Sequence, residues 1–415
     1  MRAFHDPLKK SLKILSAFFK KLGLAYRLFY IPRKVWFPPK VCDILIYDAA
    51  GIEIFSPYLE GYSITVLHTR GESINSVVLF LSILNINFWR GKIWTAYTGS
   101  FVRFCKPKLV ITFIDNSEYF YSILTSRGTV KMFIQNGIRG KLSDVFQVSS
   151  HLKEKHYKVD YMLVFGDHIG REYKKLLSGQ VTVIGSIKNN CFRRTKLCVY
   201  GTVRFISQWR PLVEEGCHFA LLTESGKTLH HQDFYRSERF ILPLLERWCK
   251  RRGKSLEVVG FNNILSNEEK IFFDSILPAG SYTFVPQGLF PDSYELTDSA
   301  EMLVFIDSTL GYEGLARGNR VACFSTRGKD VECSSCDYGW PGDFPDSGPF
   351  WTNSQDAIEV SRILDYVSSV SDREWSEQLS LHFKGIMDYD PGNQRFVNLL
   401  KQVIYDGSDR STAGY

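Results

Sequence analysis

The sequence has no uninterrupted hydrophobic run long enough to cross a bilayer as a helix. Its most apolar stretch, Val77–Ile86, is too short and is broken by Ser and Asn. The N-terminus also lacks the continuous apolar core and the small-residue cleavage site of a signal peptide. With 44% hydrophobic and 23% charged residues, the composition is that of a soluble globular protein rather than a membrane-spanning one.

A second Cys-x-x-Cys pair is also missing. The nine cysteines are scattered and odd in number, which indicates a reducing compartment in which most thiols are buried as small apolar side chains. Cys333 and Cys336 have the only suggestive spacing, and a zinc site would need two more ligands nearby. We therefore expect an ordinary loop there, no bound metal and no cofactor.

The chain has no internal repeat and no low-complexity segment, and its 415 residues are enough for two domains. From Val41 onwards, short apolar runs alternate with helical patterns, which predicts parallel sheets covered by helices. We expect an α/β fold of two Rossmann-like domains facing a cleft, residues 41–192 and 200–370. Helices in residues 371–406 would pack across the two lobes, and residues 407–415 would form a disordered tail.

Strands and helices can be assigned within this alternation. The predicted strands are Asp43–Tyr47, Ile64–Leu67, Leu109–Ile114, Val130–Ile134, Tyr161–Phe165, Val181–Ile184, Val203–Ile206, Leu256–Val259, Thr283–Val285, Met302–Ile306 and Val321–Phe324. The predicted helices include Ile93–Cys105, Phe234–Arg251, Leu310–Arg317, Asp356–Val367, Asp372–Met387 and Arg395–Ile404.

Residues 1–40 are strongly basic, with ten Lys or Arg against the single acid Asp6. On a helix, Leu8, Leu12, Leu15 and their apolar neighbours fall on one arc and the lysines on the other. This pattern is typical of a helix lying in a membrane interface, so we expect residues 1–37 to bind an anionic membrane surface. The alternative is a helix packed on the protein itself. The apolar arc is too wide for a nucleic-acid arm, and no nucleic-acid partner is expected.

Polar residues follow several strands of the first predicted domain. Because ligands meet a parallel sheet at the carboxyl ends of its strands, these residues are predicted to line a cleft, although each one alone is also ordinary turn chemistry. The set comprises Arg70, Glu72, Asp115, Asn116, Gln135, Asn136, Asp167 and His168.

The second predicted domain contains a strand–helix–strand unit, Met302–Ser325. Asp307, Ser308 and Thr309 offer N-cap chemistry to a helix that starts there and includes Gly311, and free N–H groups at such a start bind anions. Glu313 lies one turn further along and could reach a ribose hydroxyl. An ordinary βαβ crossover with a good cap is the alternative.

Seven segments in order resemble a family of bacterial surface-carbohydrate (O-antigen) biosynthesis proteins. They are Thr69–Asn75, Leu109–Asn116, Phe133–Gly137, Asp160–Gly166, Ile184–Asn190, Ile206–Pro211 and Asp307–Glu313. That family looks like GT-B glycosyltransferases and is similar in layout to the capsule Kdo transferases and the glycerophosphotransferases of wall polymers. The resemblance covers roughly residues 41 to 325.

The resemblance implies transfer of a sugar from a nucleotide-sugar donor to a lipid-linked or polysaccharide acceptor. The protein would work in the cytoplasm at the inner face of the plasma membrane. Donor nucleotide and phosphates would meet Ser308, Thr309 and Glu313 together with Ser207, Gln208 and Arg210. Arg210 would neutralise charge on the leaving phosphate in a metal-independent reaction.

The acceptor hydroxyl needs a carboxylate as general base. Asp115 and Glu72 are the first candidates and Asp233 the third. A retaining enzyme could instead use one carboxylate as nucleophile. His230 and His231 would bind an anionic sugar or cap a helix.

Two other functions are compatible with the same layout. One is a sugar-nucleotide 2-epimerase, although a basic amphipathic N-terminus suits a membrane-anchored acceptor better than a soluble nucleotide sugar. The other is a non-catalytic sugar- or nucleotide-binding module in a polysaccharide assembly complex.

Overall fold

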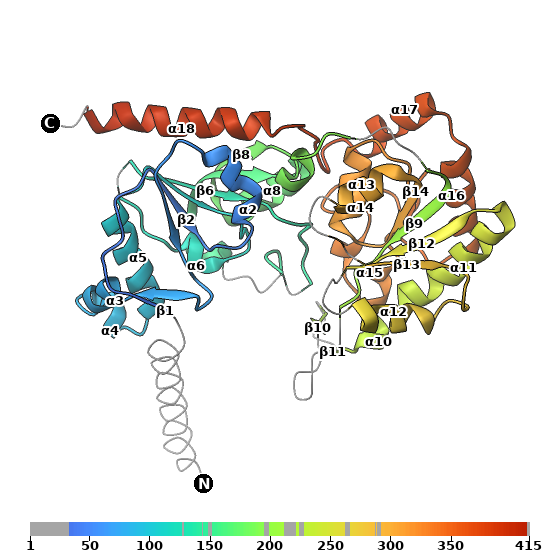
Figure 1. The fold of residues 1–415 in the computed structure, drawn as a ribbon, viewed down its shortest axis with the longest axis horizontal. Coiled ribbons are helices and arrows are strands. Elements are labelled where there is room, and N and C mark those ends of the chain that lie inside the picture. Colours follow the sequence, from blue (N-terminus) through green and yellow to red (C-terminus); the bar gives the residue numbers. More distant parts are fainter. Residues whose placement is uncertain are drawn as a thin grey trace, which may run out of the picture. The chain divides into compact units, whose positions relative to one another are not determined.

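A computed structural model of the chain describes residues 33–126, 128–142, 144–147, 152–194, 199–210, 221–223, 228–261, 266–286, 288 and 292–412 (Figure 1). The predicted interfacial helix lies outside the described residues. The strand β1 (Arg33–Val35) pairs in parallel with the strand β4 (Ser73–Asn75). Among the described residues, no helix combines the length and the apolar character that a bilayer span requires.

The first large sheet is six-stranded and parallel, with the order β3-β2-β5-β6-β7-β8. Its inner strands β2 and β5 are fully buried, as expected for apolar runs in a parallel sheet covered on both faces. The strands are β2 (Ile44–Tyr47), β3 (Ile64–Leu67), β5 (Leu109–Thr112), β6 (Val130–Ile134), β7 (Lys158–Val164) and β8 (Ser178–Val183). The helices of this part are α2 (Ile52–Phe55), η1 (Ser56–Leu59), α3 (Ser76–Ser82), α4 (Ile86–Trp89), α5 (Ile93–Cys105), α6 (Glu118–Tyr121), α7 (Leu152–Lys155), α8 (Asp167–Leu176) and α9 (Ile187–Asn190).

The second large sheet is also six-stranded and parallel, with the order β13-β12-β9-β14-β15-β16. Its strands are β9 (Val199–Ile206), β12 (Ser255–Val259), β13 (Thr283–Val285), β14 (Ala300–Phe305), β15 (Val321–Phe324) and β16 (Trp351–Thr352). A short antiparallel pair, β10 (Leu221–Leu222) and β11 (Thr228–Leu229), precedes the helices. These are α10 (His231–Phe234), α11 (Arg236–Arg252), α12 (Ser266–Asp274), α13 (Asp292–Ser299), α14 (Thr309–Ala316), α15 (Arg327–Asp330), η2 (Ser334–Cys336), α16 (Ala357–Ser369), α17 (Asp372–His382) and α18 (Gln394–Thr412).

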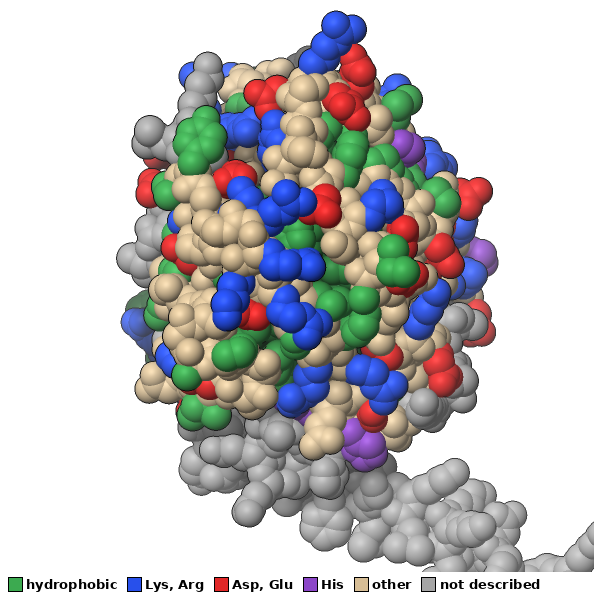
Figure 2. Space-filling model, turned by 90° about the vertical axis from the view of Figure 1, so that its right-hand side faces the viewer, with side chains coloured by type: hydrophobic (Ala, Val, Ile, Leu, Met, Phe, Trp, Pro, Cys, Tyr) green, Lys and Arg blue, Asp and Glu red, His purple; other side chains and the backbone are tan. Residues whose placement is uncertain are grey.

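The predicted α/β class with two Rossmann-like parallel sheets is confirmed. By contacts the chain divides into two compact units, unit 1 (residues 1–133 and 400–415) and unit 2 (residues 134–399). On the side of unit 2 that Figure 2 shows, Lys and Arg side chains flank a strip of hydrophobic ones. The last turn of α11 contains Lys250, Arg251 and Arg252, whose positive charges are favourable at a helix C-terminus.

Two predicted helices have different bounds in the structure. The run predicted as Phe234–Arg251 is divided, because His230 and Asp233 form a capping box that starts the separate helix α10, and α11 begins only after Tyr235. The helix predicted to end at Ile404 continues to Thr412, through most of the predicted disordered tail. Once a helix is established, each further residue adds one backbone hydrogen bond, which lets polar residues extend it.

Candidate functional site

The candidate site is built on α14 in unit 2, at the carboxyl end of β14. Ser308 is the N-cap residue in extended geometry, and the helix begins at Thr309 as predicted. Gly311 is required by packing, because a Cβ there would lie 2.2 Å from the Phe305 ring. The helix can therefore approach β14 closely, with its N–H groups directed at the adjoining space.

A cavity of about 490 Å³, here called the α14 cavity, lies at this helix start. It is lined by Asn136, Lys188, Ile206, Ser207, Gln208, Arg210, Val259, Gly260, Phe261, Gly288, Ser293, Tyr294, Ser308, Thr309, Leu310 and Glu313. Of the predicted nucleotide-binding residues, only Gly311 is absent from this lining. The structure thus brings together Ser207, Gln208, Arg210, Ser308, Thr309 and Glu313.

Glu313 is almost completely buried in the wall of the α14 cavity. Its carboxylate accepts hydrogen bonds from the Ser186 hydroxyl (2.5 Å) and the Tyr294 hydroxyl (3.0 Å). Burial raises the pKa of Glu313, and the two hydroxyls and the charges of Lys188 and Arg317 oppose that rise. A carboxylate can accept about four hydrogen bonds, so Glu313 keeps capacity for a ligand hydroxyl.

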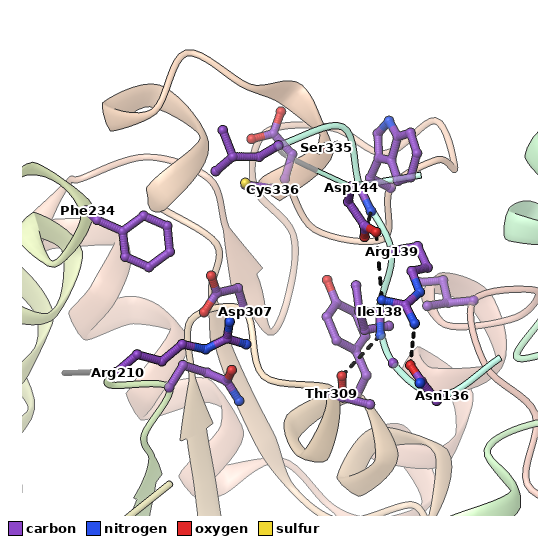
Figure 3. Close-up of a pocket in the computed structure, with 18 residues that line it drawn as sticks. Asn136, Ile138, Arg139, Asp144, Arg210, Phe234, Asp307, Thr309, Ser335 and Cys336 are labelled. Carbon is purple, nitrogen blue, oxygen red and sulfur yellow. Dashed lines mark hydrogen bonds and ion pairs between the residues drawn. The ribbon is translucent and has the colours of Figure 1, made fainter. Parts of the chain in front are cut away.

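A second cavity of about 420 Å³, here called the Asp337 cavity, adjoins the first. It is lined by Asn136, Gly137, Ile138, Arg139, Gly140, Leu142, Asp144, Gln208, Arg210, Phe234, Asp307, Thr309, Tyr312, Ser335, Cys336, Asp337, Trp340 and Ile386. Figure 3 shows Arg210 and Phe234 on one side, Asn136 and Arg139 on the other, and Thr309 at the base. Asn136, Gln208, Arg210 and Thr309 line both cavities, so these four residues form a shared wall.

The shared wall is held by hydrogen bonds. Gln208 Nε2 donates to the Ser308 hydroxyl (2.9 Å), and the backbone N–H of Ile138 donates to Thr309 Oγ1 (3.1 Å). Arg210 is held by its backbone, whose N–H donates to the Tyr235 hydroxyl (2.7 Å). Its exposed guanidinium lies 5.6 Å from the centre of the Phe261 ring. Arg210 is thus a cation placed between the two cavities on a fixed backbone.

Three carboxylates line the Asp337 cavity, and they differ in their partners. Asp144 accepts from two backbone N–H groups and pairs with Arg139, and Asp307 binds Arg327 through both oxygens. Within the described part of the chain, no group donates a hydrogen bond to the Asp337 carboxylate. Gly328 makes room for it, because a Cβ there would lie 2.3 Å from Asp337 Oδ1.

The electrostatic surroundings of Asp337 set it apart from an ordinary carboxyl. Burial raises the pKa of Asp337 to about 6, the charge of Asp346 adds to the rise, and Lys329 opposes it. A half-buried carboxylate with this pKa in a cavity can take up a proton near neutral pH.

Arg327 forms the support beneath Asp307. Its side chain is fully buried, pairs with Glu238 (2.7 Å) and Asp307 (2.7 Å), and stacks 4.1 Å from the centre of the Phe234 ring. Burial raises the pKa of Glu238, and Arg327 opposes this rise. The Arg327 guanidinium therefore fixes the positions of two carboxylates and of the Phe234 ring, which lines the Asp337 cavity.

Several predicted site residues serve other contacts. Ser207 donates to Glu269 (2.5 Å) as well as facing the α14 cavity, and Gln135 is buried, bonding Gly137 and Phe165. His230 and Asp233 cap α10, Asp233 pairs with Arg236, and the His231 ring contacts the backbone oxygen of Arg210. Neither cavity is lined by these two histidines, Asp233 or Gln135.

The remaining predicted residues, Arg70, Glu72, Asp115 and Asn116, lie in unit 1. Arg70 pairs with Asp48 (3.0 Å), and Glu72 is exposed and accepts from the backbone of Arg70 (2.9 Å). Asp115 is fully buried, and its backbone oxygen accepts from the Tyr121 hydroxyl. None of the four lines the two cavities of unit 2.

Sequence reasoning missed Arg139, Asp337 and Arg327. Arg327 is the third residue after β15, so the rule that selected polar residues after other strands could have found it. Asp337 lies in a Gly-, Pro- and aromatic-rich loop that has no periodicity to place it.

Among the described residues, no group of three or more His, Cys, Asp or Glu is arranged to hold a metal ion. The chain does contain an Asp-x-Asp sequence, at Asp388 and Asp390. Asp388 pairs with Arg395 (2.5 Å), and Asp390 accepts from the Arg395 backbone (2.8 Å).

One similar solved structure reaches a TM-score of 0.50, and two others lie just below that value. A structure of the wall teichoic acid polymerase TagF soaked with CDPG aligns with a TM-score of 0.50 and 10% identity, covering 97% of this chain and 99% of that one. S. aureus MnaA with UDP aligns with a TM-score of 0.49 and 9% identity, covering 89% of this chain and 96% of that one. UDP-GlcNAc 2-epimerase from Methanocaldococcus jannaschii, with UDP-GlcNAc and UDP, aligns with a TM-score of 0.46 and 11% identity. The alignment covers 89% of this chain and 99% of that one. The fold is of the GT-B type, with two Rossmann-like domains.

The family follows from the sequence match. A protein family described as "putative O-antigen biosynthesis protein" matches residues 132–404, and the chain belongs to this family. No curated protein matches the sequence. The predicted resemblance to this family is confirmed, and the match begins at residue 132 rather than at residue 41 as expected.

Proposed function

We propose that the protein is a glycosyltransferase that moves a sugar from a nucleotide-sugar donor to a lipid-linked or polysaccharide acceptor during surface-polysaccharide synthesis. The observation that carries this proposal is the pair of adjoining cavities at the start of α14, with the Arg210 cation in their shared wall. Family membership and the GT-B-type fold support it.

In this proposal the donor nucleotide occupies the α14 cavity. The diphosphate lies at the helix start, where the N–H groups and the Arg210 guanidinium stabilise negative charge. Phe261 and Tyr294 offer aromatic surface for the base or ribose, and Glu313 accepts from a ribose hydroxyl. This keeps the predicted roles of Ser308, Thr309, Arg210 and Glu313.

The transferred sugar and the acceptor hydroxyl occupy the Asp337 cavity. The acceptor oxygen forms a bond to the anomeric carbon, the bond from that carbon to the diphosphate breaks, and the nucleotide leaves with the bonding electrons. The Asp337 carboxylate takes the hydroxyl proton. We assign the base to Asp337 rather than to Asp115, Glu72 or Asp233, because it is the carboxylate that lines the cavity without a hydrogen-bond donor in the described chain.

A panel of nucleotide sugars tests the proposal. Purified full-length protein is incubated with each donor, and released nucleotide and new sugar nucleotides are measured. Slow release of nucleotide from one donor, accelerated by a glycan acceptor, is the expected result. Formation of an isomeric sugar nucleotide would make the protein an epimerase. Binding without turnover of any donor would make it a non-catalytic module.

The role of Glu313 gives a prediction on binding. Glu313→Gln is expected to weaken binding of the donor nucleotide about 10- to 100-fold, because a hydrogen bond to a charged group contributes about 1.5–3 kcal/mol. Titration calorimetry with the nucleotide measures the change. Glu295→Gln, on the exposed surface of α13, is the matched control and should bind normally. An unchanged affinity for Glu313→Gln would remove the carboxylate from the ribose site.

We further propose that the protein acts at the cytoplasmic face of the plasma membrane, where residues 1–37 bind anionic lipid. The surplus of cations in this sequence supports the proposal. A lipid-linked acceptor would be presented at the same surface.

A further inference from the structure

Helices α3 and α4 of unit 1 and the turn between them expose large apolar side chains. Phe80, Leu84, Ile86 and Trp89 are each 61–79% exposed, and we call these four residues the α3–α4 patch. Both helices pack against α5, and α3 also contacts β1, as Figure 1 shows. A contiguous set of exposed apolar residues on one supersecondary unit marks an interaction surface.

The local structure holds these side chains outward. Asn75 caps α3 by accepting from Val78 N–H (3.1 Å), and the buried face of the helix is formed by Val78 and Ser82. Asn85 caps α4 by accepting from Asn87 N–H (3.0 Å). Trp89 Nε1 donates to the Ile83 carbonyl (2.8 Å). The indole can therefore enter an apolar medium without carrying an unpaired donor.

The stretch of sequence that carries the patch has positive charges and no negative ones. Residues 73–114 contain no Asp or Glu and five Lys or Arg, of which Arg90 and Lys92 are exposed directly beside Trp89. Asn75 Nδ2 also binds the Phe37 carbonyl (2.7 Å), which ties the exposed segment Arg33–Val35 and its two cations to the same unit. The nearest acid in sequence is Glu72, whose carboxylate accepts from the backbone of Arg70.

We infer that the α3–α4 patch inserts into the interfacial layer of an anionic bilayer, in addition to any contact made by residues 1–32. Trp and Phe beside Arg and Lys is the composition that lies at a membrane–water interface, where the rings reach the acyl boundary and the cations meet lipid phosphates. A second copy of the chain fits this face poorly, because pairing it with itself would oppose like charges. Burial of the four side chains then adds to the electrostatic attraction.

Tryptophan quenching tests the inference, because residues 1–32 contain no Trp. Full-length protein carrying Trp36→Phe is mixed with vesicles of phosphatidylcholine and phosphatidylglycerol in which the acyl chains are brominated. Quenching is expected with these vesicles, and it should be weak with brominated phosphatidylcholine alone. It should be largely lost when Trp89→Phe is added, while the protein still sediments with the vesicles. Sedimentation without quenching in the Trp36→Phe protein would overturn the inference.

A second pair of variants measures the apolar contribution. Phe80→Gln with Leu84→Gln is expected to lower the vesicle partition coefficient at least about tenfold. Ile358→Gln with Leu381→Gln is the matched control, since both residues are as exposed but belong to unit 2. Unchanged partitioning, or a change in molar mass of the first variant without vesicles, would overturn the inference, the latter in favour of a second copy. Neither measurement uses a donor, so the outcome is independent of the proposed function.

Discussion

Asp337→Asn is expected to slow sugar transfer about 10²- to 10⁴-fold, the usual contribution of a positioned general base. Nucleotide binding should stay within about twofold, because Asp337 does not line the α14 cavity. The measurement is acceptor-dependent release of nucleotide at saturating donor, with calorimetry for binding. Transfer retained at the wild-type rate would show that Asp337 is not the base.

The pH profile separates a base from a merely structural residue. With a pKa of about 6, Asp337 is ionised above that pH, so the wild-type rate should rise as the pH increases through 6 and then level off. Asp337→Asn should lose this rise. Asp346→Asn is the matched control: removing that negative charge lowers the pKa of Asp337, so the rise moves to lower pH with little change in the plateau. A profile unmoved by either change would contradict the assignment.

The raised pKa of Asp337 also predicts how the free energy of unfolding depends on pH. Between the ordinary carboxyl pKa of 3.8 and the folded value of about 6, the folded protein holds a proton that the unfolded chain has lost. The contribution of Asp337 to the free energy of unfolding is therefore fully favourable below pH 3.8 and falls as the pH rises through 6. Asp337→Asn should remove this loss and leave the protein no less stable at pH 7.

Arg327→Met is expected to lower the free energy of unfolding by about 3–5 kcal/mol. The substitution leaves Glu238, which is buried, and Asp307 close together without the cation that pairs with both. It also removes the stacking on Phe234. Urea unfolding followed by tryptophan fluorescence measures the change.

Two further variants test whether the lower stability of Arg327→Met comes from its buried ion pairs. Arg362→Met removes the cation of an ion pair with Glu359 in which both side chains are partly exposed, and it should cost less than about 1 kcal/mol. Adding Glu238→Gln to Arg327→Met should recover part of the loss, because one of the uncompensated buried charges disappears. If Arg327→Met unfolds within 1 kcal/mol of the wild type, the buried pairs do not stabilise the fold.

The parallel sheets could be predicted because their central strands are continuous apolar runs. Ile44–Tyr47 and Leu109–Thr112 are buried on both faces, and no charged side chain interrupts either run. The start of α14 was predictable for a different reason: Ser308 and Thr309 combine cap chemistry with a buried strand before them. Local rules suffice where one short segment contains all the information.

The Asp337 cavity could not be predicted in the same way. Asn136, Arg210, Asp307 and Asp337 come from four separate loops, and their meeting depends on how the chain crosses between strands. The paired His230 and His231 show the reverse case. The sequence left two roles open for them, binding of an anionic sugar and capping of a helix. In the structure His230 caps α10 and the His231 ring contacts the Arg210 backbone. Polar side chains that cap a helix through hydrogen bonds to the backbone are of the same types as those that bind ligands, so the sequence alone does not separate the two roles.

The hydrogen bond from Ile138 to Thr309 joins a loop and a helix start that are 171 residues apart in the sequence. In the proposed enzyme, the donor touches one side of this bond and the acceptor the other. A ligand in one cavity that displaces this hydrogen bond changes the affinity of the other cavity for its own ligand. Thermodynamic linkage requires that each ligand change the affinity for the other by the same factor. Donor and acceptor would then each help or hinder the binding of the other to an equal degree, whichever of the two binds first.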